Sequence, residues 1–421
     1  MTRVWWRCVV SVLLVSGSPA AAHASEVDLL LDKLVARGIL TSADASEIRD
    51  DMKHEQEAST ASLAKDTLPD SSRHWKWSGD IRLREEYRNR SGDGTDTNRQ
   101  RIRFRYGVDA KVSDQLKVGA RMATGSITDP ISTNQSFSTS FNHKTLVLDR
   151  AFAEYAPEIP GLSKTVVTGG IIPNPFWVVG PLVWDDDLNF DGAAVKLSED
   201  LGPRVTLFTN DGVFSLNTDV IQSSALWSLQ GGVVLKPFAD AHEELLKSLK
   251  VTSALAYHDY MNVTSKASNS TALTNAGGTK GNSTNLKDLN LINPTFEVAS
   301  QYHDVPFGLF ADMVHNTAAA TLNDGFQIGL KIGKARVPFD PLKGWEAGYF
   351  FERIEPDATL GAFTDSDFGN GGTNHRGHVY WLKLATIKNS TLQLKYFNTQ
   401  EIKGPTKNHA DTFQADWVTT F

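Results

Sequence analysis

The stretch that decides the fold is Arg99 to Val112, which reads Arg-Gln-Arg-Ile-Arg-Phe-Arg-Tyr-Gly-Val-Asp-Ala-Lys-Val. Successive side chains of a β-strand point to opposite faces of the sheet. One face of this strand would carry Gln100, Ile102, Phe104, Tyr106, Val108, Ala110 and Val112. The other would carry Arg99, Arg101, Arg103, Arg105, Gly107, Asp109 and Lys111. Such a strand fits a soluble sandwich, whose second sheet covers the apolar face, or an outer-membrane barrel, whose apolar face meets lipid.

The two ends of the chain favour export. The chain has 421 residues and a net charge of −7, which excludes a generally basic nucleic-acid binder. Residues 1–24 have the pattern of a signal peptide: Arg3 and Arg7, then a short apolar run, then Ala22-His23-Ala24. A permanent anchor is the alternative, but the run is too short for a membrane-spanning helix. We expect a mature chain from Ser25 that lacks cysteine, because Cys8 is the only one.

Residues 25–66 predict a short α-helical segment. Val27, Leu30, Leu31 and Leu34 have helical spacing, and Gly38 would end this first helix. Thr41 opens a second one, with Asp44 three positions later. We expect a helical hairpin on the periplasmic side, either a spacer or an oligomerisation or cell-wall contact, followed by a linker over 67–74.

From Trp75 onward the sequence alternates with the period of a strand. No later stretch reaches 18 apolar residues, so a chain that spans a membrane must do so as a closed barrel. We predict an all-β transmembrane antiparallel barrel over 75–421 with sixteen strands. Their ranges are 75–88, 99–112, 115–126, 145–156, 164–172, 188–198, 203–212, 225–236, 249–262, 290–303, 306–317, 324–335, 345–355, 376–388, 391–400 and 410–421. The strands at 145–156 and 164–172 alternate poorly.

The connections and the last strand support the membrane interpretation. Most links from odd to even strands are long, namely 127–144, 173–187, 213–224, 263–289 and 356–375, whereas most even-to-odd links are short. Outer-membrane barrels have short periplasmic turns and long outer loops. The chain ends in Phe421, which shares a face with Trp417. This strand resembles the closing strand that the barrel assembly machinery recognises, so Trp417 and Phe421 form a predicted assembly signal.

Several motifs follow one another in a familiar order. They are Gly38 to Thr41, Leu148 to Tyr155, Gly169 to Phe176 and Asp365 to Asn374. Together they resemble the proteobacterial "putative porin" family over nearly the whole mature chain. The resemblance implies an outer-membrane barrel of porin type in a Gram-negative bacterium, without a defined substrate.

Basic residues gather on the polar face of the first three strands. They are Arg82, Arg84, Arg101, Arg103, Arg105, Lys117 and Arg121. Because these strands are neighbours, we expect one basic wall along the pore. Its alternative role is structural, through pairing with Asp80, Glu86 and Asp109, but five arginines on the first two strands outnumber these three carboxylates. Some of them should therefore remain free to attract anions.

The link over 173–187 is too apolar for an exposed loop. Burying its apolar side chains is worth about 1.5–3 kcal/mol each, so we expect it to fold into the lumen as a constriction. Its candidate residues are Pro173, Pro175, Phe176, Trp177, Trp184, Asp185, Asp186 and Asp187. The three aspartates would face the basic wall across the pore. The alternative is packing at the barrel rim or at a subunit interface.

No catalytic motif or metal-binding pattern is recognisable. The triple aspartate lacks the spacing and the glycine of a calcium loop, so we expect no metal and no cofactor. We predict a passive channel for small hydrophilic solutes, embedded in outer-membrane lipid as a homotrimer. The alternatives are a channel selective for anions or organic acids, a structural or adhesive surface barrel, and, last, a soluble secreted β-protein.

Overall fold

The computed structural model describes residues 74–91, 96–137, 141–217, 224–263, 280–283, 286, 288–404 and 407–421. The expected signal peptide (1–24), the expected helices (25–66) and the expected linker up to residue 73 lie outside this set. The described residues belong to one compact unit, His74–Phe421. Within them, no helix is long and apolar enough to cross a membrane.

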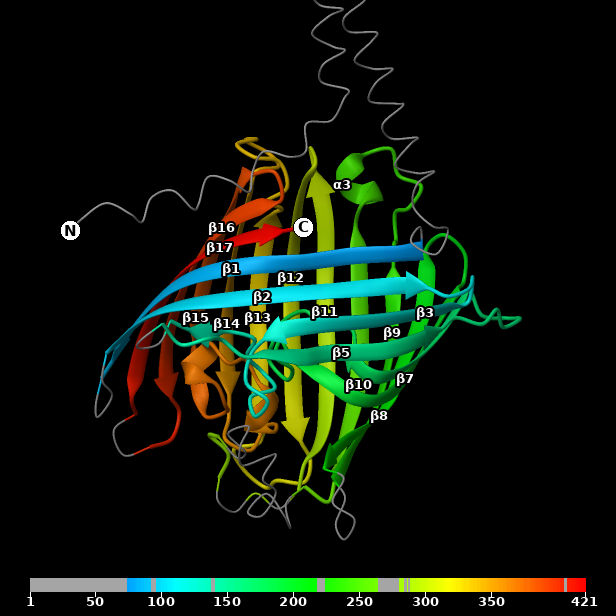
Figure 1. Ribbon diagram of the computed structural model, residues 1–421. Helices are drawn as coiled ribbons and strands as arrows, with labels where there is room; N and C mark the ends of the chain where they lie inside the picture. The colour runs from blue at the N-terminus through cyan, green and yellow to red at the C-terminus, as the bar shows by residue number, and fades with distance from the viewer. Residues whose placement is uncertain are drawn as a thin grey trace, which may run out of the picture. The chain divides into compact units, whose positions relative to one another are not determined.

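This unit is built from β-strands that follow the predicted ranges closely (Figure 1). The strands are β1 (Trp75–Arg90), β2 (Thr97–Lys111), β3 (Leu116–Thr124), β4 (Gln135–Ser136), β5 (Leu146–Tyr155), β6 (Lys164–Pro173), β7 (Asn189–Asp200), β8 (Val205–Asn217), β9 (Ser224–Leu235), β10 (Lys250–Met261), β11 (Asn290–Tyr302), β12 (Val305–Asn316), β13 (Asp324–Gly333), β14 (Trp345–Ile354), β15 (His375–Ile387), β16 (Ser390–Glu401) and β17 (His409–Thr420). Strand β4 has only two residues and extends the line of β3 along β2. The other sixteen strands form the wall.

The wall is a closed antiparallel barrel. Each long strand pairs with the next along the chain, and β17 pairs with β1 over Ala410–Thr420. Phe421 completes the closure, because its backbone N–H and C=O both bond to Gly79, at 3.0 and 2.9 Å. Closure leaves no free first or last strand, which a hydrocarbon environment requires. The prediction of a sixteen-stranded barrel is therefore confirmed.

The two faces of the wall follow the alternation of the sequence. On β1, Asp80, Arg84 and Glu86 are buried on the inner face, whereas Trp77 and Leu83 are 52% and 40% exposed on the outer face. The same outer face carries exposed apolar side chains on most of the long strands, among them Tyr106, Leu148, Leu255, Leu309, Ile328 and Trp417. An apolar exterior around a polar interior is the pattern of a barrel that stands in lipid.

A β-bulge explains why the strand near 145–156 alternates poorly. The register between β3 and β5 shifts between Arg121 and Met122, which pair with Arg150 and Leu148. Asp149 is the extra residue, and both Asp149 and Arg150 bond to inner-face side chains. A bulge places two neighbouring residues against one partner and breaks the period of two.

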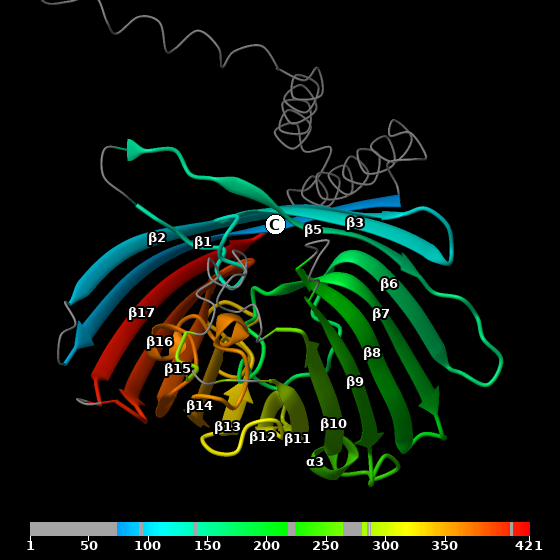
Figure 2. The same ribbon diagram turned by 90° about the horizontal axis from the view of Figure 1, so that it is seen from below.

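Long connections gather at one end of the barrel, and two of them fold inward. They are the β6–β7 loop (174–188) and the β14–β15 loop (355–374), which contains the short 3₁₀ helices η3 (Gly361–Phe363) and η4 (Phe368–Asn370). Figure 2 shows the orange β14–β15 loop inside the ring of strands. The opposite end has tight turns, except for three longer links: 156–163, 334–344, and 236–249, which holds the one-turn helix α3 (Glu244–Lys247).

Candidate constriction of the lumen

Nine arginines line one side of the lumen, and we call them the arginine cluster. They lie on the inner faces of β1, β2, β3 and β5, and they are Arg82, Arg84, Arg88, Arg99, Arg101, Arg103, Arg105, Arg121 and Arg150. The alternation of β1 and β2 places most of them. The register then sets Arg82 opposite Arg103 and Arg84 opposite Arg101. Like charges at directly opposed positions repel, so the cluster needs carboxylates between its members.

Two carboxylates of β1 meet this need from within the wall. Asp80 accepts from Arg103 Nε at 2.9 Å and from Arg105 Nε at 2.6 Å. Glu86 pairs with Arg99 and lies 3.8 Å from Arg101 Nη1. Both carboxylates are buried, which strengthens each charge-assisted hydrogen bond. This pairing of Asp80 and Glu86 corresponds to the structural alternative considered for the basic wall.

The remaining arginines have partners far away in the chain. Arg84 donates to Asp416 on β17 at 2.7 and 2.8 Å and to Asp367 of the β14–β15 loop at 2.9 and 3.1 Å. Arg82 donates to Asn134, and Arg121 pairs with Asp149. Lys117, the last member of the predicted basic wall, pairs with Glu154 at 3.1 Å on the neighbouring strand. The arginine cluster is therefore more fully paired than the counts on β1 and β2 indicate.

The β6–β7 loop packs against the opposite inner wall. Trp177 donates its N–H to Gln230 Oε1 at 2.8 Å and accepts from Gln230 Nε2 at 2.9 Å. Gly180 approaches β13 so closely that a Cβ there would lie 1.7 Å from Gln327 Oε1. Phe176, Leu182, Val183 and Trp184 are buried in one apolar cluster with wall residues such as Phe190 and Phe214. Burial of these side chains supplies the driving force that holds the loop inside.

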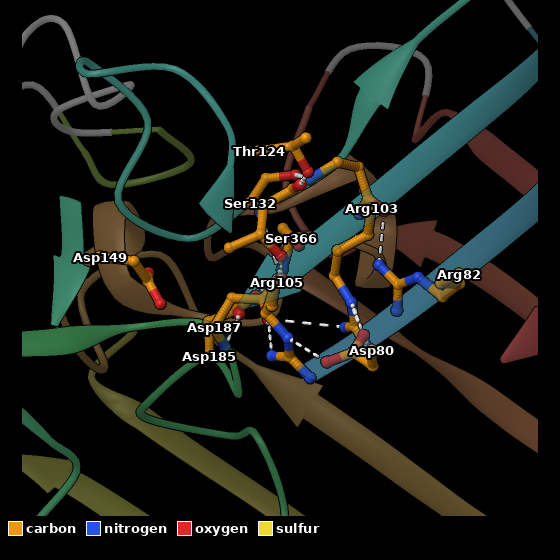
Figure 3. Close-up of polar contacts among 12 residues, drawn as sticks. Asp80, Arg82, Arg103, Arg105, Thr124, Ser132, Asp149, Asp185, Asp187 and Ser366 are labelled. Atoms are coloured by element: carbon orange, nitrogen blue, oxygen red, sulfur yellow. Dashed lines mark hydrogen bonds and ion pairs between the residues drawn. The ribbon is translucent and has the colours of Figure 1, made fainter. Parts of the chain in front are cut away.

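The three aspartates at the end of this loop have three different environments. Asp187 accepts from Thr133 Oγ1 at 2.8 Å and lies 3.3 Å from Arg105 and 3.8 Å from Arg103 (Figure 3). Asp185 is buried and turns away from the arginines, because its Oδ2 accepts from the N–H of Ser366 at 2.7 Å. Asp186 is exposed and has no ion pair among the described residues. Only one of the three therefore meets the basic wall directly.

The β14–β15 loop is the part of the constriction that sequence reasoning did not assign. It reaches Asp185 through the N–H of Ser366 and through Phe363 O, which accepts from Asp185 N at 2.8 Å. Its Asp367 binds Arg84, and its Phe363 and Phe368 are buried among the apolar side chains of the lumen. The sequence did contain an indication that this loop is buried. Phe363 and Phe368 are large apolar side chains in a mostly polar loop, and such side chains are usually buried.

Burial changes the charge of two carboxyls at the contact between the loops. Burial and the neighbouring Asp365 and Asp187 raise the pKa of Asp185 well above its usual value. Burial also raises the pKa of Asp365 to about 6, despite the opposing effect of Lys395. Burial opposes ionisation of Asp367, but Arg84 outweighs it and holds that pKa below the usual range. The loop contact thus contains protonatable carboxyls beside a firmly ionised one.

The arginine cluster has a net positive charge once its ion-paired carboxylates are counted. In the part of the chain that the structure describes, six carboxylates form ion pairs with it: Asp80, Glu86, Asp149, Asp187, Asp367 and Asp416. Nine arginines against six carboxylates leave an excess of three positive charges, or two if Asp186 is added. Among the described residues, three buried guanidinium nitrogens accordingly have no hydrogen-bond partner: Arg82 Nε, Arg101 Nε and Arg121 Nη2. No group of His, Cys, Asp and Glu in this part of the chain is arranged to hold a metal ion.

A closed barrel of sixteen antiparallel strands with an apolar exterior, a charged interior and inward-folded loops defines an outer-membrane porin-like channel. Comparison with protein families agrees. The chain belongs to the family described as "Putative porin", whose model matches residues 92–289 and 290–421.

Among solved structures, OprB supports the shared barrel fold, and two others are less similar to this chain. OprB of Pseudomonas putida at high pH has 12% identity and a TM-score of 0.53, with 83% of this chain and 95% of that chain covered. DcaP of Acinetobacter baumannii has 12% identity, 82% and 97% coverage and a TM-score of 0.46. The Salmonella typhi OmpF complex with daunomycin has 8% identity, 82% and 97% coverage and a TM-score of 0.48. No curated protein matches the chain.

Proposed function

We propose that this porin passes small hydrophilic solutes and ions passively, with a preference for anions set by the arginine cluster. The observation that carries the proposal is the excess of three positive charges on one side of the constriction. Rings and walls of charged side chains at the narrowest point of a pore select the permeating ion. Because six carboxylates neutralise most of the cluster, the preference should be moderate.

A channel selective for organic acids is the second candidate. It is favoured by the guanidinium nitrogens of Arg82, Arg101 and Arg121 that have no hydrogen-bond partner among the described residues. A buried donor without a partner is destabilised by about 1–3 kcal/mol, and the positive charge of such a guanidinium attracts a carboxylate that passes through the lumen. By analogy with barrels of this size, we also propose a homotrimer, with residues 25–66 in the periplasm.

Removing arginines from β2 tests the anion preference. The variant Arg101→Ser/Arg103→Ser/Arg105→Ser removes three positive charges, so the excess falls from three to zero and the exposed Asp186 then dominates. We expect the reversal potential in a salt gradient across a planar bilayer to move towards cation preference. Arg204→Ser is the matched control, because Arg204 lies in the exposed β7–β8 turn and pairs with Asp240. An unchanged reversal potential in the triple variant would show that the arginine cluster does not determine the ion selectivity.

A further inference from the structure

A cavity of about 950 Å³ lies beside the constriction, where β5 to β8 reach the long-loop end of the barrel. Its walls come from the start of β5, the start of β7, the end of β8 and the segment 124–133 after β3. Trp184 and Phe363 of the two inward-folded loops close its inner side. This volume is at the upper end of the range of about 300–1,000 Å³ that is usual for small-molecule sites.

The cavity coincides with a gap in the hydrogen bonding of the wall, which we call the β5–β6 cleft. Strands β5 and β6 pair only from Ala151–Ile171 to Tyr155–Val167. Beyond that point, residues 146–150 of β5 pair with β3 alone, and Ile172 and Pro173 pair with β7 alone. The first half of β5 therefore has a free edge.

The lining residues show that the cleft passes through the wall. Leu146 and Leu148 belong to the outer apolar face and are 43% and 56% exposed, whereas Phe190 and Phe214 are buried on the inner face. In a membrane, a free strand edge is tolerated only where it borders protein or a polar, hydrated space. The cleft thus offers apolar walls next to unpaired backbone groups, which suits an amphipathic molecule.

The charged groups of the cleft all have one sign. Its lining contains Asp129, Asp149 and Asp191 and neither lysine nor arginine. Asp149 is neutralised by Arg121. The Asp129 carboxylate accepts from the N–H of Ile131, and the charges of Arg101 and Lys280 partly offset it. The carboxylate of Asp191 has no hydrogen bond or ion pair among the described residues, and no charged group acts on it. Asp191 therefore contributes most of a local negative field in this largely apolar cavity, and that field attracts a cation.

We propose that the β5–β6 cleft binds organic cations with an apolar body, at a site separate from the arginine cluster. The apolar body lies against the leucine and phenylalanine side chains, and the cationic group lies near Asp129 and Asp191. The arginine cluster would repel the same molecule from the constriction. The cleft therefore extends the range of solutes that the protein can hold beyond the anions favoured by the lumen.

The test uses two probes that have the same shape and opposite charge. Binding of tetraphenylphosphonium and of tetraphenylborate to the purified full-length protein in non-ionic detergent is measured by equilibrium dialysis, with empty micelles as the blank. Tetramethylammonium reports charge without an apolar body. We expect tetraphenylphosphonium to bind most tightly, tetraphenylborate at least ten-fold more weakly, and tetramethylammonium negligibly. Equal binding of the two tetraphenyl ions would overturn the proposal.

Variants assign the binding to the cleft. An exposed ion pair contributes about 0.2–1 kcal/mol, so each lost carboxylate should weaken tetraphenylphosphonium binding by about 1.4- to five-fold. Asp129→Asn/Asp191→Asn should therefore weaken it by about ten-fold, and Asp129→Lys/Asp191→Lys should make tetraphenylborate the tighter ligand. The matched control is Asp211→Asn on β8, whose carboxylate is outside the cleft lining. Unchanged binding in the double asparagine variant, or equal loss in the control, would contradict the assignment. Heat-modifiability on gels confirms that each variant is folded.

Discussion

The buried side-chain amide of Gln230 holds the β6–β7 loop in position. Gln230 is 1% exposed and accepts from both Trp177 N–H and Asn210 Nδ2 at 2.8 Å. Its own amide nitrogen donates to Trp177 O at 2.9 Å. A side-chain amide that pairs with both groups of one peptide unit imitates the pairing between strands. Gln230 therefore holds the loop against β9 by its backbone, whatever the loop side chains are.

Replacing this amide should loosen the constriction. In Gln230→Leu, the N–H and C=O of Trp177 lose their partners, and each unsatisfied group destabilises the inward position by about 1–3 kcal/mol. We expect a larger and noisier single-channel conductance in planar bilayers. Gln393→Leu is the control, because Gln393 lies on the inner face of β16 without a hydrogen bond to this loop. If both variants conduct like the parent protein, Gln230 does not position the loop.

Gly79 makes room for the last residue of the chain. A Cβ at Gly79 would lie 2.6 Å from the ring of Phe421 and 2.5 Å from Arg105 O. The Phe421 ring also stacks on Tyr106, with 6.3 Å between the ring centroids. A side chain at position 79 would therefore push the terminal ring away from the seam between β1 and β17.

A bulky residue at the seam should thus impair assembly. We expect Gly79→Val to reduce the heat-modifiable, folded form in outer-membrane fractions several-fold, as should deletion of Phe421. Gly231→Val on β9 is the control, because a Cβ there meets no atom within 4 Å. Normal levels of folded protein in both test variants would show that the terminal ring is dispensable for assembly.

At the level of elements, the two inward-folded loops form one unit through Asp185. Its side chain and backbone bond to Ser366 and Phe363, while Asp367 ties the unit to Arg84. Asp365 has a folded pKa of about 6, above its usual 3.8. For a carboxyl with a raised pKa, the stabilising contribution is complete below the usual value and is lost as pH rises through the folded value.

The contact between the loops should therefore be firmer at pH 5 than at pH 7.5. At pH 7.5 Asp365 is largely ionised beside the ionised Asp367, and the two like charges repel each other. We expect faster hydrogen exchange over residues 361–367, and more frequent current fluctuations, at the higher pH. Asp365→Asn should remove this pH dependence, whereas Asp304→Asn, which alters an exposed carboxylate in the β11–β12 turn, should keep it. A pH dependence that persists in Asp365→Asn would exclude this carboxyl as its source.

The elements also show what a sequence can predict here. Strands such as β2 and β13 alternate cleanly because each residue meets either lipid or the lumen, so their ranges and faces could be predicted. The bulge at Asp149 could not, because it depends on the register with β3. The pairing of Arg84 with Asp367 and Asp416 joins residues about three hundred positions apart. Such contacts follow from barrel closure and loop packing, which local patterns do not encode.

At the scale of the whole molecule, closure and constriction depend on each other. Pairing of β1 with β17 brings Asp416 beside Arg84, and the same arginine anchors the β14–β15 loop inside the lumen. The sequence was enough to predict the sixteen-stranded barrel. It did not assign the second loop, which sets how much of the basic wall stays uncompensated.

Single-channel recording of the purified protein in a planar bilayer under a salt gradient tests most directly whether the protein is an anion-preferring porin. We expect stable conductance steps and a reversal potential of moderate anion preference, because three positive charges of the arginine cluster remain uncompensated at the constriction. A silent protein that is still heat-modifiable, or a channel with clear cation preference, would contradict this expectation.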